Sequence, residues 1–148
     1  MKYLLIFIGL TIIFSCTNSD QKTTIIKKSA EDALKDSANY TSVEWIDPVV
    51  QDLGKAKEGQ VLEIGWKFKN TGNKPLVIAD VHPGCGCTVA DKPEEPIAPG
   101  KEGEIKAKFD THGHPGNQFK QVFIRANNSN KNGEGEDVLA FKVDVAKQ

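Results

Sequence analysis

The chain has 148 residues, which is enough for one domain with a short appendage. Nineteen Lys and Arg residues face 20 Asp and Glu residues, and a net charge of −1 is too weak to attract nucleic acid or an anionic membrane surface. Hydrophobic residues at 39% and charged residues at 26% exclude collagen, a coiled coil and a fully disordered chain.

The first residues predict a secretory signal. Met1 and Lys2 form a short basic start, and residues 3–14 are almost all apolar. This run is too short to span a bilayer, which takes about 20 residues, but it has the length and flanks of a signal peptide. An ordinary signal peptide or an N-terminal anchor helix would explain the run alone.

The residues around Cys16 decide between these interpretations. Ile13-Phe14-Ser15-Cys16 resembles a bacterial lipobox, in which the cysteine is lipidated and becomes the first residue of the mature chain. We therefore predict a lipoprotein signal peptide over residues 1–15 and lipid attachment at Cys16. Losing residues 1–15 removes one base, Lys2, and no acid, so 18 basic residues face 20 acidic ones and the net charge becomes −2.

Residues 16–41 predict a lipidated flexible tether. Residues 17–24 are polar and show no hydrophobic period. Ser29 is placed to cap a short helix with acidic residues in its first turn, but the apolar face of that helix is thin and predicts fraying. The compartment beyond the signal is extracytoplasmic, where disulfides are permitted.

Residues 42–148 predict an all-β domain. Apolar and polar residues alternate with a period of two, most clearly over 62–69, and Pro, Gly and Asn breaks separate the runs. Trp66 falls on the apolar face of this run and is predicted to lie in the core. The expected strands lie at 43–47, 62–69, 76–81 (covered on both sides), 88–90, 105–109, 119–126 and 139–145. Together they predict an immunoglobulin-like antiparallel β-sandwich of about seven strands.

Several motifs in this domain resemble those of a bacterial envelope family. They are Asn70-Thr71-Gly72, Cys85-Gly86-Cys87-Thr88 and Pro96-Ile97-Ala98-Pro99-Gly100, within a match from about Trp45 to Val145. The family is an immunoglobulin-like domain of unknown function that is common in lipoproteins of Bacteroidetes. The resemblance implies an immunoglobulin-like sandwich related in shape to ASH-type modules, and it implies no established activity.

Cys85 and Cys87 are the residues of this domain with the sharpest chemistry. In an extended strand their Cα atoms would lie about 6.5–7 Å apart, at or beyond the upper limit for a disulfide. Gly86 between them lets the chain kink, so a strained and labile disulfide is one interpretation, and it makes a thiol-redox role conceivable. The alternative, which we rank first, is a structural pair that packs against the end of the sandwich.

A soft-metal site is the third interpretation of the same pair. Two thiolates with His82, and with His112 or His114 from another loop, have the ligand types that Cu(I) and Zn(II) prefer. The mature chain contains no methionine, however, and histidines in loops are more often solvated than bound to metal. We therefore rank this interpretation last and expect no metal.

Motifs for catalysis are absent from the sequence. No Gly-x-Ser-x-Gly elbow, His-Glu-x-x-His motif or P-loop occurs. We therefore expect no enzyme activity and no cofactor, and predict a lipid-anchored envelope protein that acts as a binding or assembly module. The expected partners are the membrane, through the lipid on Cys16, and an envelope protein or glycan that the sequence does not identify. Nucleic acid is not expected.

The residues after Cys16 bear on location. Thr17 differs from the aspartate linked to inner-membrane retention in enteric bacteria. No dense acidic cluster follows Cys16, whereas such a cluster marks surface export in Bacteroidetes. By resemblance, we expect an outer-membrane protein that faces the periplasm.

Overall fold

The computed structural model describes residues 30–128 and 136–147. The predicted signal peptide over residues 1–15 and the predicted lipid site at Cys16 lie outside the described residues. Among the described residues, no helix is long and apolar enough to cross a lipid bilayer.

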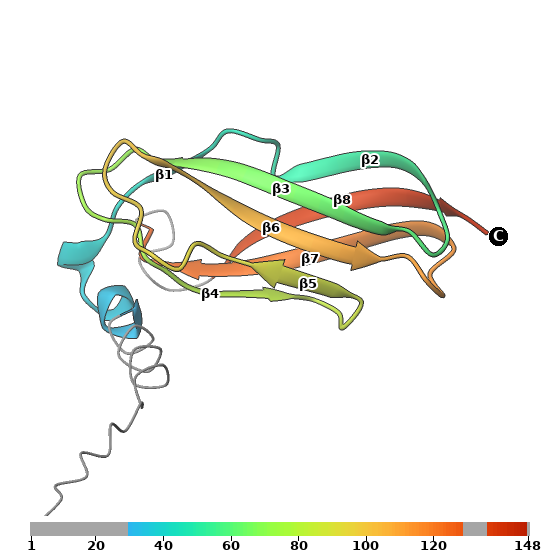
Figure 1. Ribbon diagram of the computed structural model, residues 1–148. Coiled ribbons are helices and arrows are strands. Elements are labelled where there is room, and N and C mark those ends of the chain that lie inside the picture. Colours follow the sequence, from blue (N-terminus) through green and yellow to red (C-terminus); the bar gives the residue numbers. More distant parts are fainter. Residues whose placement is uncertain (1–29, 129–135, 148) are drawn as a thin grey trace, which may run out of the picture.

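The domain is a sandwich of two four-stranded sheets (Figure 1). One sheet has the order β1-β3-β6-β5 and the other β2-β8-β7-β4. The strands are β1 (Val43–Trp45), β2 (Val50–Lys57), β3 (Val61–Asn70), β4 (Ile78–Pro83), β5 (Thr88–Asp91), β6 (Glu102–Asp110), β7 (Gly116–Ala126) and β8 (Asp137–Ala146). This arrangement confirms the predicted all-β, immunoglobulin-like sandwich.

The first strand is divided between the two sheets, which explains why eight strands appear in place of about seven. β1 pairs with β3, and after a crossing that contains Pro48 the chain continues as β2 in the other sheet. Proline has no N–H to donate to a ladder, so it suits this switch. β2 runs parallel to β8, whereas every other named strand pair is antiparallel, so the predicted antiparallel sandwich contains one parallel pair.

The core lies between the sheets and comes from the alternation of the strands. Trp66, Phe68, Phe109 and Phe141 are among its largest fully buried side chains, so the prediction that Trp66 lies in the core is confirmed. β4 differs from its prediction. It lies at the edge of its sheet and most of its residues are only partly buried, so it is not covered on both sides as expected.

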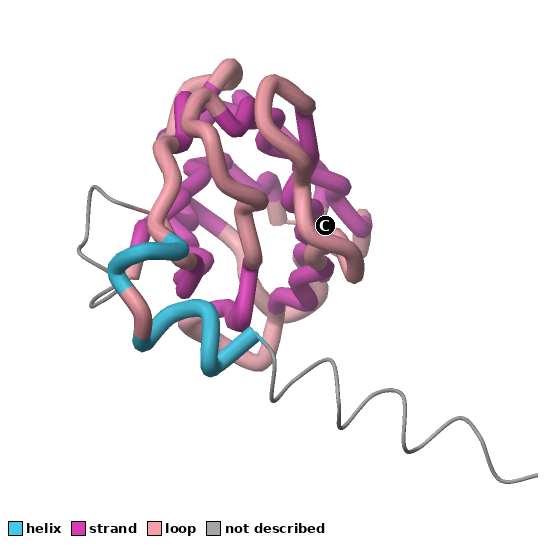
Figure 2. Tube along the Cα trace, turned by 90° about the vertical axis from the view of Figure 1, so that its left-hand side faces the viewer, coloured by secondary structure: helices cyan, strands magenta, loops and turns pink. Residues whose placement is uncertain are grey.

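The end of the predicted tether packs against the sandwich. Residues 30–35 form a helical turn and η1 (Ser37–Asn39) follows, both at one end of the molecule (Figure 2). Ala30 and Leu34 lie one helical turn apart and are both buried, and Glu31 forms an ion pair with Arg125 of β7. Residues 30–41, on the N-terminal side of the predicted boundary at residue 42, therefore pack against the sandwich.

Two buried asparagines fasten this N-terminal segment (residues 30–42). The Asn70 side chain accepts hydrogen bonds from the Thr41 hydroxyl (2.8 Å) and the Gly72 N–H (3.1 Å), and donates to two backbone carbonyls. The Asn127 side chain donates to the carbonyl of Asn39 (2.6 Å) and accepts from a backbone N–H, while its carbonyl accepts from the N–H of Thr41 (3.0 Å). Because these partners come from both sheets, the clamp formed by Thr41, Asn70 and Asn127 closes this end of the sandwich.

Candidate functional site

The cysteine loop (residues 84–87) connects β4 to β5 at the opposite end of the sandwich from the N-terminal segment (Figure 1). It therefore joins the edge strand of one sheet to the edge strand of the other. Two backbone hydrogen bonds hold its ends, since the Gly84 N–H donates to the Gln121 carbonyl (2.9 Å) and the Asp110 N–H donates to the Cys87 carbonyl (3.1 Å). The loop is thus fixed to β7 on one side and to the end of β6 on the other.

Cys85 and Cys87 form a disulfide. Their Cα atoms lie 5.4 Å apart, which is within the usual range for a disulfide and shorter than an extended strand would allow. The reason is that residues 84–87 form a bend and turn and are not part of either strand. The kink that Gly86 permits is therefore present, and it brings the two sulfur atoms together.

The two cysteines have different surroundings. Both are partly buried, but only Cys87 packs against the hydrophobic core cluster. Gly86 between them is exposed, and a Cβ atom placed on it would have no neighbour within 4 Å. Thr88, which is buried, places its hydroxyl 3.7 Å from the sulfur of Cys85 and 4.0 Å from that of Cys87. The two cysteines thus differ in that Cys87 packs on the core cluster and Cys85 does not.

The small size of the ring that the disulfide closes limits how much the bond can stabilise the fold. The bond spans a sequence separation of only two residues, so it joins no distant parts of the chain. In the chain-entropy model, closing so short a loop stabilises a protein by about 1.6 kcal/mol, against about 3 kcal/mol for a 15-residue loop. Fixing the fold is therefore a weak explanation for this bond.

We expect the double variant Cys85→Ser, Cys87→Ser to remain folded and to lose no more than about 2 kcal/mol in free energy of unfolding, because the closed loop is so short. Urea denaturation followed by tryptophan fluorescence measures this loss. A loss of about 4 kcal/mol or more, as for a disulfide between distant segments, would restore the structural interpretation.

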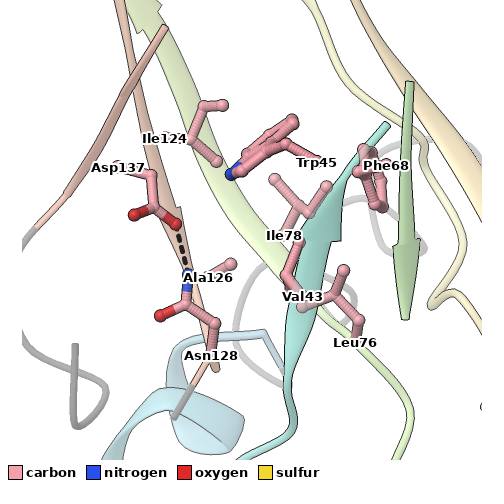
Figure 3. Close-up of a pocket in the computed structure, with 9 residues that line it drawn as sticks. All are labelled: Val43, Trp45, Phe68, Leu76, Ile78, Ile124, Ala126, Asn128 and Asp137. Atoms are coloured by element: carbon pink, nitrogen blue, oxygen red, sulfur yellow. Dashed lines mark hydrogen bonds between the residues drawn. The ribbon is translucent and has the colours of Figure 1, made fainter. Parts of the chain in front are cut away.

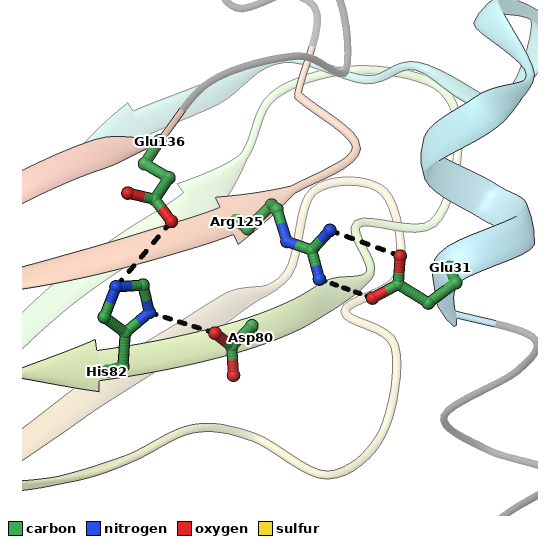
Figure 4. Close-up of polar contacts among 5 residues, drawn as sticks. All are labelled: Glu31, Asp80, His82, Arg125 and Glu136. Carbon is green, nitrogen blue, oxygen red and sulfur yellow. Dashed lines mark hydrogen bonds and ion pairs between the residues drawn. The ribbon is translucent and has the colours of Figure 1, made fainter.

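The histidines of the predicted soft-metal site have other neighbours. His82 stacks on Phe123 and its ring nitrogens lie 2.9 Å from Asp80 and 3.7 Å from Glu136 (Figure 4). His114 packs against the ring of Phe109. His112 follows β6, where its backbone N–H donates to Asp110.

In these positions the histidines do not form the soft-metal site that was the third interpretation of the sequence. In residues 30–128 and 136–147, no group of three or more His, Cys, Asp or Glu side chains is arranged to hold a metal ion. The sulfur atoms of Cys85 and Cys87 are bonded to each other, and a soft metal would need them as thiolates. A metal role would therefore require prior reduction of the pair.

A small cavity lies between the sheets, nearer the N-terminal segment (Figure 3). Its volume of about 10 Å³ is at the lower limit for one water molecule. The lining is mainly apolar, and its two polar residues, Asn128 and Asp137, are hydrogen-bonded to each other. This cavity is too small to bind an organic ligand.

The comparison with protein families agrees with the fold. A model of the family described as protein of unknown function (DUF1573) matches residues 43–145. The chain belongs to this DUF1573 family. Membership confirms the expected immunoglobulin-like domain of unknown function, and the match begins at the first residue of β1. No curated protein matches the chain in sequence.

Solved structures share the fold of this DUF1573 chain at low sequence identity. A protein of unknown function from Porphyromonas gingivalis is 16% identical with a TM-score of 0.62, covering 74% of this chain and 49% of that one, so the chain spans about half of its length. The ASH/PapD-like domain 7 of human CEP192 is 7% identical with a TM-score of 0.54, covering 96% and 99%. The Vibrio cholerae VesB protease is 12% identical with a TM-score of 0.51, covering 78% and 34%. At these identities, the similarity concerns the fold alone.

The three sequence motifs of this DUF1573 chain lie at opposite ends of the sandwich. Asn70-Thr71-Gly72 and the Pro96–Gly100 turn meet at the N-terminal end, where the Asn70 side chain donates to the carbonyl of Ile97 (2.8 Å) and the Asn70 carbonyl accepts from the Gly100 N–H (2.8 Å). The cysteine motif lies at the other end. The sequence suggested a chemistry for Cys85 and Cys87, whereas Asn70 stood out only as part of a family-like motif and its structural role was not predicted.

Proposed function

We propose that this protein is a lipid-anchored module of the bacterial cell envelope that acts by binding rather than by catalysis. Support comes from the lipobox-like residues around Cys16, from the immunoglobulin-like sandwich, and from the Bacteroidetes source of one similar structure. Sandwiches of this kind usually make contacts through loops and exposed strand edges. The fold alone does not determine function, so the proposal depends on the placement of the loops.

The observation that carries the proposal is the separation between the two ends of the sandwich. The chain enters through the N-terminal segment at one end, and the cysteine loop lies at the other (Figure 1). An anchor attached before residue 30 would therefore hold the first end toward the membrane and present the cysteine end to partners. We propose the outer membrane, facing the periplasm, as the location, and an envelope protein or glycan as the partner.

Replacing Cys16 by serine in the full chain tests the anchor. Because only a cysteine thiol at this position can accept the lipid, we expect Cys16→Ser to lose radiolabelled palmitate and to leave the membrane fraction. The double variant Cys85→Ser, Cys87→Ser is the matched control and keeps both lipid and membrane location. Sucrose-gradient fractionation then assigns the membrane. A Cys16→Ser protein that still carries palmitate and sediments with membranes would contradict the proposal.

Thiol exchange at the cysteine loop is a second candidate function. The observation that favours it is the disulfide between Cys85 and Cys87, which is partly exposed and closes only a very short loop. Exposed disulfides are generally more readily reduced than those that hold a core together. If native protein resists reduction by dithiothreitol until it is unfolded, this second function is excluded.

A further inference from the structure

We infer that the Cys85–Cys87 disulfide is reduced by a dithiol partner, and that the sulfur of Cys85 is the atom attacked. This inference rests on the second candidate function above, because it specifies the attacked atom and the class of partner for the same site. It requires that an attacking thiolate can reach one sulfur atom more easily than the other. It also requires that a second thiol on the partner is needed to complete the reduction.

The first requirement is met by the placement of the two cysteines. Cys87 packs against the hydrophobic core cluster, and its carbonyl is fixed by the Asp110 N–H. Cys85 lies between two exposed glycines, Gly84 and Gly86, and is not among the residues that pack on that cluster. A thiolate must approach a disulfide in line with the S–S bond, so the packing of Cys87 on the core favours attack on Cys85 with Cys87 as the leaving sulfur.

Thr88 places a polar group near both sulfur atoms, the leaving one included. Its side chain is buried, and its hydroxyl lies 4.0 Å from the sulfur of Cys87 and 3.7 Å from that of Cys85. A thiolate on Cys87 would otherwise lie beside apolar core side chains, where a charge without a hydrogen bond is unfavourable. The hydroxyl can donate to it once the bond breaks, so we assign Thr88 as a positioning residue.

The exchange balances as a two-electron transfer. A partner thiolate bonds to the Cys85 sulfur, the Cys85–Cys87 bond breaks, and Cys87 leaves as a thiolate that takes up a proton. The second thiol of the partner, as its thiolate, then attacks the partner sulfur of the mixed disulfide and releases the Cys85 thiolate, which is also protonated. The partner ends as a disulfide, and this protein ends with two thiols.

The short spacing explains why the partner must be a dithiol. After the first step, the Cys87 thiolate lies two residues from the mixed disulfide, so its effective concentration is high and it reverses the attack of a monothiol. Only a second thiol on the same partner molecule reacts fast enough to compete with this reverse attack by the Cys87 thiolate. The site is therefore matched to a dithiol protein and poorly matched to a small monothiol.

Purified full-length protein, under native conditions, tests the partner class. We expect dithiothreitol to reduce Cys85–Cys87 fully, measured by alkylation and intact mass, while glutathione at the same thiol concentration leaves most molecules oxidised. Equal reduction by both reagents would overturn the dithiol assignment while leaving the second candidate function in place. No reduction by dithiothreitol before unfolding would overturn both.

Single variants test which sulfur is attacked. Glutathione disulfide should modify Cys85 in the Cys87→Ser variant about tenfold faster than it modifies Cys87 in the Cys85→Ser variant, because a more accessible thiol reacts faster. Thr88→Val should slow reduction by dithiothreitol without a matching change in the thermal unfolding midpoint. Equal rates at the two thiols, with both variants folded by circular dichroism, would overturn the assignment of Cys85.

Discussion

Replacing Asn70 by alanine is expected to lower the free energy of unfolding by about 3–5 kcal/mol. The side chain is fully buried and makes four hydrogen bonds, to the Thr41 hydroxyl, the Gly72 N–H and the carbonyls of Lys74 and Ile97. Alanine replaces none of them, and each buried polar group that is left without a partner costs about 1–3 kcal/mol. Such a loss is a large part of the 5–15 kcal/mol that is typical of a domain.

Asn73→Ala is the matched control for this experiment. Asn73 lies in the same turn but is exposed, so the same chemical change should cost less than about 0.5 kcal/mol. Urea denaturation of both variants measures the difference. Similar losses at the two positions would mean that Asn70 does not hold the turns together. Hydrogen exchange at the Gly72 amide should also become faster in Asn70→Ala alone, because this N–H loses its shorter bond to Asn70 and keeps only the bond to the Ser42 carbonyl (3.3 Å).

Gly103→Ala is expected to destabilise the domain by about 1–3 kcal/mol through overpacking. Gly103 lies opposite Phe68 in the β3–β6 pair, and a Cβ atom at this position would lie 2.4 Å from the Phe68 ring. The ring cannot move away freely, because it is buried in the core and Trp45 packs against it edge-on with ring centroids 5.5 Å apart. The substitution therefore forces a shift of the strand or of both aromatic rings.

Gly65→Ala provides a control at the same contact distance. A Cβ atom on Gly65 would also come within 2.4 Å of a neighbour, but that neighbour is the carboxylate of Glu104, at the end of a partly exposed side chain. The carboxylate can rotate into solvent, so we expect Gly65→Ala to be neutral within about 0.5 kcal/mol. Thermal unfolding of the two variants separates overpacking from the general cost of replacing a strand glycine.

The strands that the sequence predicted are those in which one face is buried throughout. β3 alternates between buried and less buried residues along its whole length, and β6 and β8 do so over most of theirs, so their hydrophobic pattern was sufficient. β2 was missed because its register shifts between Asp52 and Lys55, where Gly54 has a φ of +69°, and the shift breaks the alternation. Its parallel pairing with β8 joins residues about 90 positions apart, which no local pattern can reveal.

The candidate site was predictable in its residues but not in its geometry. Cys-Gly-Cys is visible in the sequence, whereas the turn that brings the Cα atoms to 5.4 Å depends on contacts with other strands. The Gly84 N–H donates to Gln121 of β7, and the Cys87 carbonyl accepts from Asp110 of β6. The difference in surroundings between Cys85 and Cys87 depends on the packing of the core. The structural roles of Asn70 and Asn127 were not predictable from local sequence, because their hydrogen-bond partners lie up to 88 residues away.

The clamp at Thr41 determines how the domain would respond to mechanical force. Thr41 is held through its hydroxyl by Asn70 at the end of β3, and through its N–H by the carbonyl of Asn127 just after β7. Tension that reaches the domain through residues 30–41 would therefore load both sheets together before it could peel β1 away from β3. A protein tethered by its N-terminal side would keep its sandwich closed while its far end is pulled by a bound partner.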